Sequence, residues 1–323
     1  MAEAQQGRMG VVAIGRNEGE RLQRCLGSIP RGTPIVYVDS ASTDDSVAYA
    51  RSVGAEVVEL DMRRPFSAAR ARNEGAERLT ARHPELAFVQ FVDGDCEFEP
   101  SWIADATRFL ETEPEFAAVC GRRRERHPEA SFYNQLCDAE WNTPPGETAA
   151  CGGDAMVRLT AFAAAGGYDG AVIAGEEPEF CARLRARGWR VWRLDVPMTI
   201  HDADMHHFRQ WWMRAVRSGY GYAQVWSKTR RVGAPLYGRE LARAVGWSVG
   251  PMGLAMILAA LAGPIALVTA PLLWIAQFAR LTRRDGVMGG LHLFAGKFAE
   301  TWGAMRYGAA RVAGRRHGAI YYK

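Results

Sequence analysis

The chain has 323 residues, enough to bury a full hydrophobic core in one large domain that carries an additional segment. Its formal net charge of +4 is far from the strongly basic composition of nucleic-acid-binding proteins, so we expect no nucleic-acid partner. Six cysteines occur singly, without the paired spacing of zinc or redox sites, and residues 1–9 lack the apolar core of a secretory signal. We therefore expect a reducing, cytosolic environment.

Apolar runs alternate with helical patterns over the first 120 residues. Strands are predicted at residues 11–14, 35–38, 56–60, 86–92 and 116–120, and helices at 18–28, 42–52, 68–82 and 102–111. This alternation predicts an α/β fold with a mostly parallel sheet covered on both faces. We expect the sheet to end near residue 120. Residues 122–153, which contain three prolines, are predicted to form loops over the functional face. Regular structure returns with a helix at 176–187, a strand at 190–194 and a helix at 208–226.

An acidic pair follows the strand predicted at 86–92. Asp93 and Asp95 lie two positions apart, so in an extended chain their carboxylates point the same way. Ligands of open α/β sheets bind beyond the carboxyl ends of strands. Such oxygen ligands suit Mg²⁺ or Mn²⁺, which would bridge a diphosphate and neutralise its charge as it leaves. Because an isolated D-x-D is more often an ordinary acidic turn, the interpretation depends on the neighbouring motifs.

Two further polar segments also follow buried strands. Asp39 ends the second strand before a Ser/Thr/Asp-rich helix start, where it is a candidate acceptor for a base or ribose; a plain strand-to-helix turn is the alternative. The first strand ends in candidates for the base pocket: Ile14, Arg16, Asn17 and Glu18. No Gly-rich phosphate loop is present, which argues against a sugar nucleotidyltransferase.

Together these segments resemble the family 2 glycosyltransferases of the GT-A fold, over about the first two-thirds of the chain. The resemblance rests on the Asn-Glu pair at 17–18, the V-D-D-G-S-x-D-like residues 38–44, the A-R-N stretch at 71–73 and the D-x-D at 93–95. It implies a nucleotide-sugar donor with Arg72 as a candidate phosphate contact, Asp93 near the donor, and a divalent metal held by Asp93 and Asp95. His201 stands where several relatives have a histidine that touches the metal or diphosphate; a structural histidine is the alternative.

The resemblance also implies an acceptor side. Gly153 and Asp154 are similar to the family's G-x-N stretch, with Asp154 in place of the usual Asn. Glu176 and Glu177 stand in place of the family's E-D pair, whose second acidic position is the catalytic base, so the base is assigned to Glu177. A carboxylate there would remove the acceptor hydroxyl proton as the sugar–phosphate bond breaks, inverting the anomeric centre. The alternative is an acidic first turn that complements the helix dipole.

The C-terminal third has the pattern of a membrane attachment. The helix at 208–226 carries Trp211 and Trp212 among arginines and is interpreted as an interfacial anchor near the acceptor entrance, with packing under the catalytic domain as the alternative. Residues 244–279 contain no charged residue, and an uncharged run of this length is too long for one straight crossing of a membrane. Gly263-Pro264 divides them, which predicts a helical hairpin. Arginines flank both ends, so both ends are expected in the cytosol, which either two crossings or a re-entrant wedge achieves. A buried core hairpin is the alternative.

Apolar residues recur at helical spacing after residue 285 among basic ones, which predicts a basic amphipathic helix that lies on anionic lipid or packs on the catalytic domain. We therefore expect a catalytic domain at 1–235, with a nucleotide-binding half at 1–122 and an acceptor half at 123–235. A membrane hairpin at 236–284 and the amphipathic helix at 285–323 complete the chain.

The predicted function is inverting transfer of a hexose-type sugar from a UDP-linked donor to a lipid-linked or membrane-delivered glycan. The expected setting is envelope or exopolysaccharide assembly at the cytoplasmic face of the inner cell membrane. A non-catalytic membrane scaffold or sensor that keeps the nucleotide pocket is the alternative, although the complete acidic set argues against it. The sequence gives no indication of oligomeric state.

Overall fold

The structure is a computed structural model that describes residues 8–314. Within these residues nine strands form one mixed sheet in the order β3-β2-β1-β4-β8-β6-β9-β5, with β7 paired to β9. Strands β1 to β4 are mutually parallel, β8 runs antiparallel between β4 and β6, and β9 returns parallel to β6. The strands are β1 (Met9–Gly15), β2 (Ile35–Asp39), β3 (Glu56–Glu59), β4 (Phe88–Asp93), β5 (Cys96–Phe98), β6 (Phe116–Glu125), β7 (Gly146–Glu147), β8 (Ala155–Arg158) and β9 (Arg190–His201).

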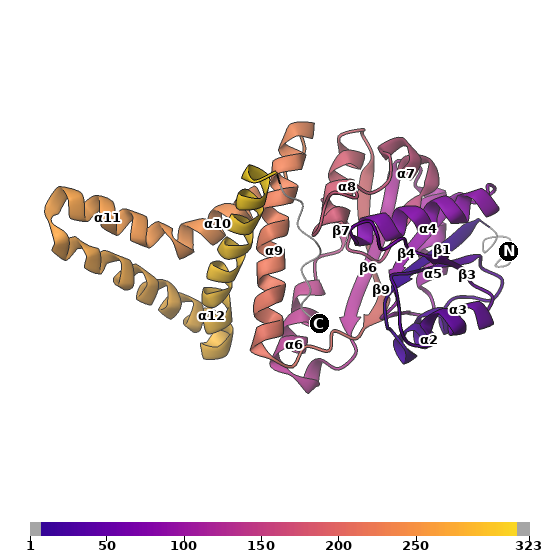
Figure 1. Cartoon of the computed structure of the whole chain (residues 1–323), viewed down its shortest axis with the longest axis horizontal. Coiled ribbons are helices and arrows are strands. Elements are labelled where there is room, and N and C mark those ends of the chain that lie inside the picture. The colour runs from indigo at the N-terminus through magenta and orange to yellow at the C-terminus, as the bar shows by residue number, and fades with distance from the viewer. Residues whose placement is uncertain (1–7, 315–323) are drawn as a thin grey trace.

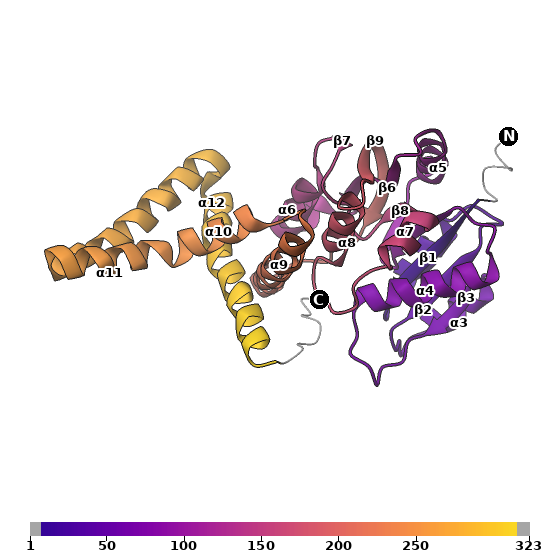
Figure 2. The ribbon, with the colours of Figure 1, turned by 90° about the horizontal axis from the view of Figure 1, so that it is seen from above.

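Helices cover both faces of the sheet, with α4 on one side and α2 and α3 on the other (Figures 1 and 2). Side chains of the central strands, such as Val12, Tyr37 and Phe91, are fully buried, as expected for a parallel sheet with two covered faces. The predicted α/β fold is therefore confirmed. The helices of this part are α2 (Glu20–Gly27), α3 (Ser46–Ser52), α4 (Ala68–Arg82), α5 (Trp102–Thr112), α6 (Phe132–Trp141), α7 (Leu159–Ala165) and α8 (Glu176–Arg185).

The segment predicted as loops, residues 122–153, is largely regular, so that prediction was wrong, as was the expected end of the sheet near residue 120. Strand β6 continues to Glu125 because its arginines are ion-paired: Arg122 contacts Asp138, with 2.9 Å between Nη2 and Oδ2. Helix α6 follows, and its N-cap Ser131 accepts from the backbone N–H of Asn134. The prolines flank α6 and do not interrupt it. A strand segment whose side chains form ion pairs contains no apolar run, so a prediction based on apolar runs misses it.

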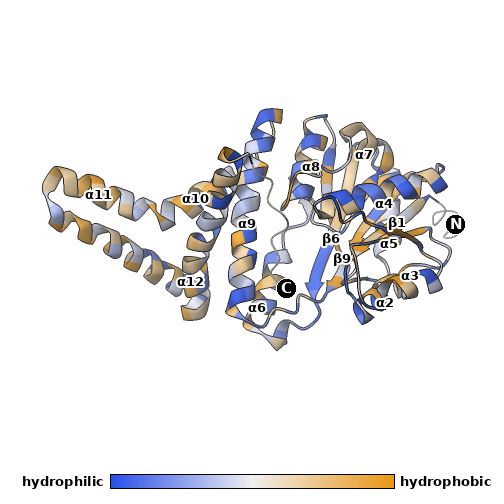
Figure 3. Cartoon of the chain, in the orientation of Figure 1, coloured by the Kyte–Doolittle hydropathy of each residue, from blue (hydrophilic) through white to orange (hydrophobic). Residues whose placement is uncertain are grey.

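The C-terminal third consists of α9 (Phe208–Thr229), α10 (Gly238–Ser248), α11 (Gly250–Ala262) and α12 (Thr269–Val312). A hairpin made by α11 and the first part of α12 projects away from the sheet, with its turn at Gly263, which has φ 99° (Figure 1). Its residues are predominantly hydrophobic, as the ribbon coloured by hydropathy shows (Figure 3). Among the described residues, the helix over 264–312 contains an 18-residue stretch that is long and apolar enough to cross a membrane. Helices α10 and α11 pass the same test as a pair bent by 51°.

The second part of α12, residues 287–312, packs directly on α9. Two glycines permit a close approach of the backbones: a Cβ at Gly219 would lie 1.8 Å from the Glu300 carbonyl oxygen, and one at Gly303 would lie 1.9 Å from that of Val216. The helix also exposes apolar side chains, with 54% of Trp302 accessible. Residues 287–312 thus pack on α9, as one of the two predicted alternatives for the amphipathic helix states, whereas contact with anionic lipid stays a prediction. Residues 315–323 of that prediction lie outside the described residues.

Candidate active site

The carboxyl ends of β1, β2 and β4 meet at one edge of the sheet. Ile14 pairs in register with Val38 and with Asp93, and the backbone N–H of Gly94 donates to the Ile14 carbonyl over 2.8 Å. A cleft of about 470 Å³ opens there. Its lining includes many of the predicted site residues: Ile14, Arg16, Glu18, Arg72, Asp93, Asp95, Glu176, Glu177 and His201. The topology therefore brings together residues separated by up to 187 positions in the sequence.

Asp93, at the end of β4, is held by two guanidinium groups. Arg72 Nη2 lies 2.8 Å from one carboxylate oxygen, and Arg123 Nη2 lies 3.5 Å from the other. Burial alone would raise the pKa of the Asp93 carboxyl, but the two arginines outweigh it and keep the pKa below its usual range. Asp93 is therefore an anion that organises cations at the floor of the cleft.

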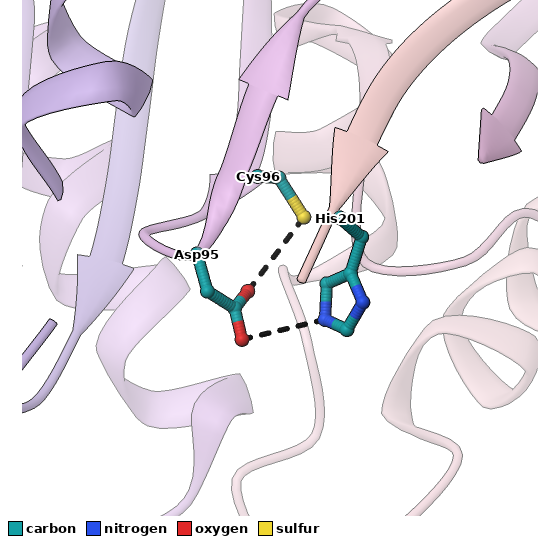
Figure 4. A group of neighbouring side chains, drawn as sticks. All are labelled: Asp95, Cys96 and His201. Carbon is teal, nitrogen blue, oxygen red and sulfur yellow. Dashed lines mark hydrogen bonds and ion pairs between the residues drawn. The ribbon is translucent and has the colours of Figure 1, made fainter. Parts of the chain in front are cut away.

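Asp95 belongs to a different group of side chains, shown in Figure 4. Its Oδ2 lies 3.3 Å from His201 Nε2, and Cys96 Sγ lies 3.7 Å from its Oδ1. Burial tends to lower the pKa of His201, but the Asp95 carboxylate overcomes it and raises that pKa. The three ligand atoms lie within 4.8 Å of one another. A carboxylate beside an imidazole nitrogen at a cleft wall fits Mn²⁺, and the carboxylate also fits Mg²⁺.

Across the cleft, the two glutamates at the start of α8 reach Arg72. The Arg72 side chain is 2% exposed, and its Nη1 lies 2.9 Å from Glu176 Oε1 and 3.3 Å from Glu177 Oε1. Burial and the like charge of Glu176 raise the pKa of Glu177 to about 7, although Arg72 opposes this. Glu177 is 17% exposed and lines the cleft, so it is accessible to a substrate and carries a proton affinity suited to a general base near neutral pH.

The two residues predicted on the acceptor side before β8 occupy structural positions. A Cβ at Gly153 would lie 2.5 Å from Arg72 Nη2 and 3.1 Å from Asp93 Oδ2, so the absence of a side chain there lets the arginine reach its carboxylates. Asp154 is completely buried. It accepts from the backbone N–H of Asp93 over 3.1 Å and pairs with Arg123 Nη2 at 2.8 Å. Asp154 therefore positions the floor of the cleft from beneath and is not part of its lining.

Two of the predicted base-pocket residues fix loops next to the cleft. Asn17 is exposed, with φ 55°, and its Oδ1 accepts from the backbone N–H of Thr43 over 2.7 Å. Asp39 is 3% exposed and accepts from the Ser42 backbone N–H and from the Tyr37 hydroxyl. These contacts join the ends of β1 and β2. Neither residue lines the cleft described above.

Helix α9 presents a different face to the cleft from the one the sequence emphasised. Trp211 is 7% exposed and packs in a small second core with its ring centroid 4.8 Å from that of His292, and Trp212 packs against the same core. The cleft is lined instead by Arg214 and Arg217, one helical turn apart on one face. The indole side chains therefore support α9 from behind and do not face the acceptor entrance.

Sequence reasoning missed Arg123 and Trp141, which also line the cleft. Arg123 connects Asp93 with Asp154, and its guanidinium carbon lies 5.5 Å from the Trp141 ring centroid. The available signal was a run of three arginines, 122–124, directly after an apolar strand. Charged residues at the end of a strand in an α/β sheet point to the ligand-binding edge.

Comparisons with known proteins agree with this geometry. Residues 11–150 match the family model described as Glycosyl transferase family 2. Mannosyltransferase PcManGT from Pyrobaculum calidifontis, in complex with GDP-Man and Mn²⁺, superposes with a TM-score of 0.63 at 19% identity, over 93% of this chain and 86% of that one. S. aureus TarS 1–349 in complex with UDP-GlcNAc has a TM-score of 0.55 at 15% identity, over 95% and 92%. The predicted family 2 resemblance and GT-A fold are confirmed.

Proposed function

We propose that this chain, whose residues 11–150 match glycosyl transferase family 2 and whose fold is GT-A, is an inverting, metal-dependent glycosyltransferase. It moves a sugar from a nucleoside-diphosphate sugar, expected to be UDP-linked, to a lipid-linked or membrane-delivered glycan. The observation that carries this proposal is a single cleft at the carboxyl edge of the sheet with Asp93 and Asp95 on its floor and Glu177 across from them.

Each side chain has a distinct role in the proposed reaction. The Glu177 carboxylate accepts the proton of the acceptor hydroxyl while that oxygen bonds to the anomeric carbon and the bond from the same carbon to the diphosphate breaks. The nucleoside diphosphate leaves with the bonding electron pair. Arg72 orients Glu177 and Glu176 and connects them to Asp93. Asp95 and His201 would hold a divalent cation, which supplies charge neutralisation for the leaving diphosphate.

The membrane assignment is supported by the hairpin. Its tip residues Leu261 and Ile265 are 80% and 82% exposed, and a contiguous apolar surface of this kind is the mark of an interaction site or a membrane-embedded segment. Arginines lie at both ends of the hairpin, so both ends are expected on the cytoplasmic side. The catalytic cleft would then act at the cytoplasmic face of the cell membrane.

The proposal is tested with full-length protein in detergent against a panel of nucleotide sugars, with metal-dependent hydrolysis as the readout. We expect turnover with one or a few donors that EDTA abolishes and Mn²⁺ or Mg²⁺ restores. Glu177→Gln should lower the turnover rate by a factor of about 10² to 10⁴, while the affinity for the nucleotide stays nearly unchanged. Asp95→Ala should weaken metal-dependent nucleotide binding. Glu147→Gln, at an exposed glutamate outside the cleft, is the matched control.

Nucleotide binding without turnover of any donor would favour the scaffold or sensor alternative. Full activity of Glu177→Gln would remove that residue from the base position. Equal nucleotide affinity with and without chelator would exclude a metal at Asp95.

A further inference from the structure

A second cavity, of about 340 Å³, lies between the loop before α4, the loop at 170–173 and the C-terminal parts of α9 and α12. Three arginines contribute to its lining: Arg64, Arg70 and Arg311. The hydroxyl-bearing rings of Tyr220 and Tyr307 also line it, and none of the described residues in the lining is acidic. Three guanidinium groups with tyrosine hydroxyls and no carboxylate form a setting selective for an anion.

Arg70 is the strongest indication that a ligand belongs there. Only 8% of the residue is exposed, yet among the described residues none of its three guanidinium nitrogens has a hydrogen-bond partner. The carboxylate paired with it, Glu74, is 3.7 Å from Nε, beyond hydrogen-bond range. Buried charged groups are normally hydrogen-bonded, and an unsatisfied one is costly. A bound anion would supply the missing acceptors.

The other two arginines lie on segments that approach from opposite sides. Arg64 is an exposed residue of the loop before α4, and Arg311, also exposed, is held near the cavity by contacts with Ser227 and Tyr307. Arginine presents a rigid fork of donors that matches phosphate oxygens in a bidentate way. The class of ligand that fits three such forks around one small cavity is a phosphate or diphosphate.

The position of this cavity next to the cleft indicates the kind of molecule to which the bound phosphate belongs. Phe66 lines both, so the two hollows adjoin at this side chain. The cavity is formed on one side by residues 170–173, a few positions before Glu176 at the start of α8, and on the other by the C-terminal end of α12, whose first part, before the non-helical Gly286, forms one arm of the apolar hairpin. A ligand that extends from this cavity into the cleft would therefore pass Phe66.

We propose that this cavity binds the phosphate or diphosphate group of a lipid-linked acceptor, with Arg64, Arg70 and Arg311 as its cations, while the sugar end of the acceptor extends past Phe66 toward Glu177. The inference rests on the proposed transferase function, because it places an acceptor in the cleft. It adds the chemical class of the acceptor, an anionic phosphate ester of a lipid, and the residues that select it.

The test measures binding and does not depend on turnover. Fluorescently labelled farnesyl diphosphate is titrated into the full-length protein in neutral detergent, with the double variant Arg64→Gln/Arg311→Gln and the control Arg63→Gln. Arg63 neighbours Arg64, is also exposed, is paired with Asp61 and does not line the cavity. Farnesol, inorganic pyrophosphate and phosphatidylglycerol vesicles are the competitor arms. Affinity for UDP with Mn²⁺ is measured on every variant.

We expect the double variant to bind the labelled diphosphate at least about tenfold more weakly, since charge-assisted hydrogen bonds are lost, while the Arg63 control stays within about twofold and UDP affinity is unchanged. Farnesol should not compete, and pyrophosphate should compete more weakly than unlabelled farnesyl diphosphate. Arg70→Lys, which keeps the charge but loses the fork, should also weaken binding.

Equal affinity of the wild type and the double variant would overturn the proposal. Competition by pyrophosphate as strong as by farnesyl diphosphate would assign the cavity to a free anion, and equally strong competition by the vesicles would assign it to a bilayer headgroup. Loss of binding on addition of UDP with Mn²⁺ would place the probe in the donor cleft. The proposed transferase function fails by a separate measurement, the absence of nucleotide-sugar turnover, so the two failures are distinguishable.

Discussion

The pH dependence of transfer should report on Glu177, because the residue can accept a proton only when it is ionised. Its pKa, raised by burial and by Glu176 to about 7, lies above the usual range of glutamates. About 90% of the side chain is then ionised at pH 8, about 10% at pH 6 and about 1% at pH 5. Activity should therefore be nearly complete above pH 8 and fall about tenfold for each unit below pH 6.

The assay is the initial rate of transfer, or of donor hydrolysis, between pH 5 and 9 at saturating donor and metal. Saturation keeps metal and donor binding from limiting the rate. In Glu176→Gln, the neighbouring negative charge is removed while the amide oxygen still accepts from Arg72. The pKa of Glu177 should fall, and the acidic limb should move to lower pH.

A rate that is flat from pH 5 to pH 8 would refute the reasoning. The reasoning would also be refuted if the loss of rate at acidic pH occurred at the same pH in Glu176→Gln, in protein that still binds donor. That loss would then report the protonation of a group other than Glu177.

Three further outcomes follow from the packing. Gly153→Ala should lower kcat by about 10 to 100-fold because its Cβ would lie 2.5 Å from Arg72 Nη2. Gly152→Ala, which has open space around it, should keep the wild-type kcat. Equal kcat values for the two variants would contradict the requirement for a residue without a side chain at position 153. Arg72→Met should cost about 3–5 kcal/mol by leaving three carboxylates without their shared counter-ion, and should lower Tm by on the order of 10 °C in differential scanning fluorimetry; a change below about 2 °C would contradict this. Leu261→Lys with Ile265→Lys should strongly weaken flotation with vesicles while donor hydrolysis persists, because each charge that must enter the hydrocarbon with the tip costs about 3 kcal/mol. Unchanged flotation would argue against membrane insertion of the tip.

The nucleotide half of the site could be anticipated because its signals are local. A buried strand followed by a carboxylate identifies the ligand-binding edge of a parallel sheet, and the ends of β1, β2 and β4 are indeed aligned in register. The apolar hairpin was equally visible, since a long uncharged run with a Gly-Pro break is typical of two apolar helices joined by a turn. Neither inference required knowing which residues distant in the sequence meet.

The partnerships inside the cleft could not be read in the same way. Arg72 was predicted as a phosphate contact, yet it is buried against Glu176, 104 positions later in the sequence. Asp93 and Asp95 have the same side chain two positions apart, but one binds arginines and the other lies beside His201. Which partner each carboxylate meets depends on β6 and β9. The extents of both strands were underestimated. Strand β6 continues to Glu125 through ion-paired arginines that do not form an apolar run, and β9, predicted to end at residue 194, continues to His201.

The glycine contact between α9 and α12 has a mechanical consequence. Because Gly219 and Gly303 let the two backbones touch, residues 287–312 are fixed against α9, whose Arg214 and Arg217 line the cleft. The hairpin joins these residues at Gly286, where the backbone of α12 is not helical. Under the proposed function and membrane attachment, the distance between the cleft and the bilayer would then limit which acceptor hydroxyls reach Glu177, according to the length of the glycan that carries them.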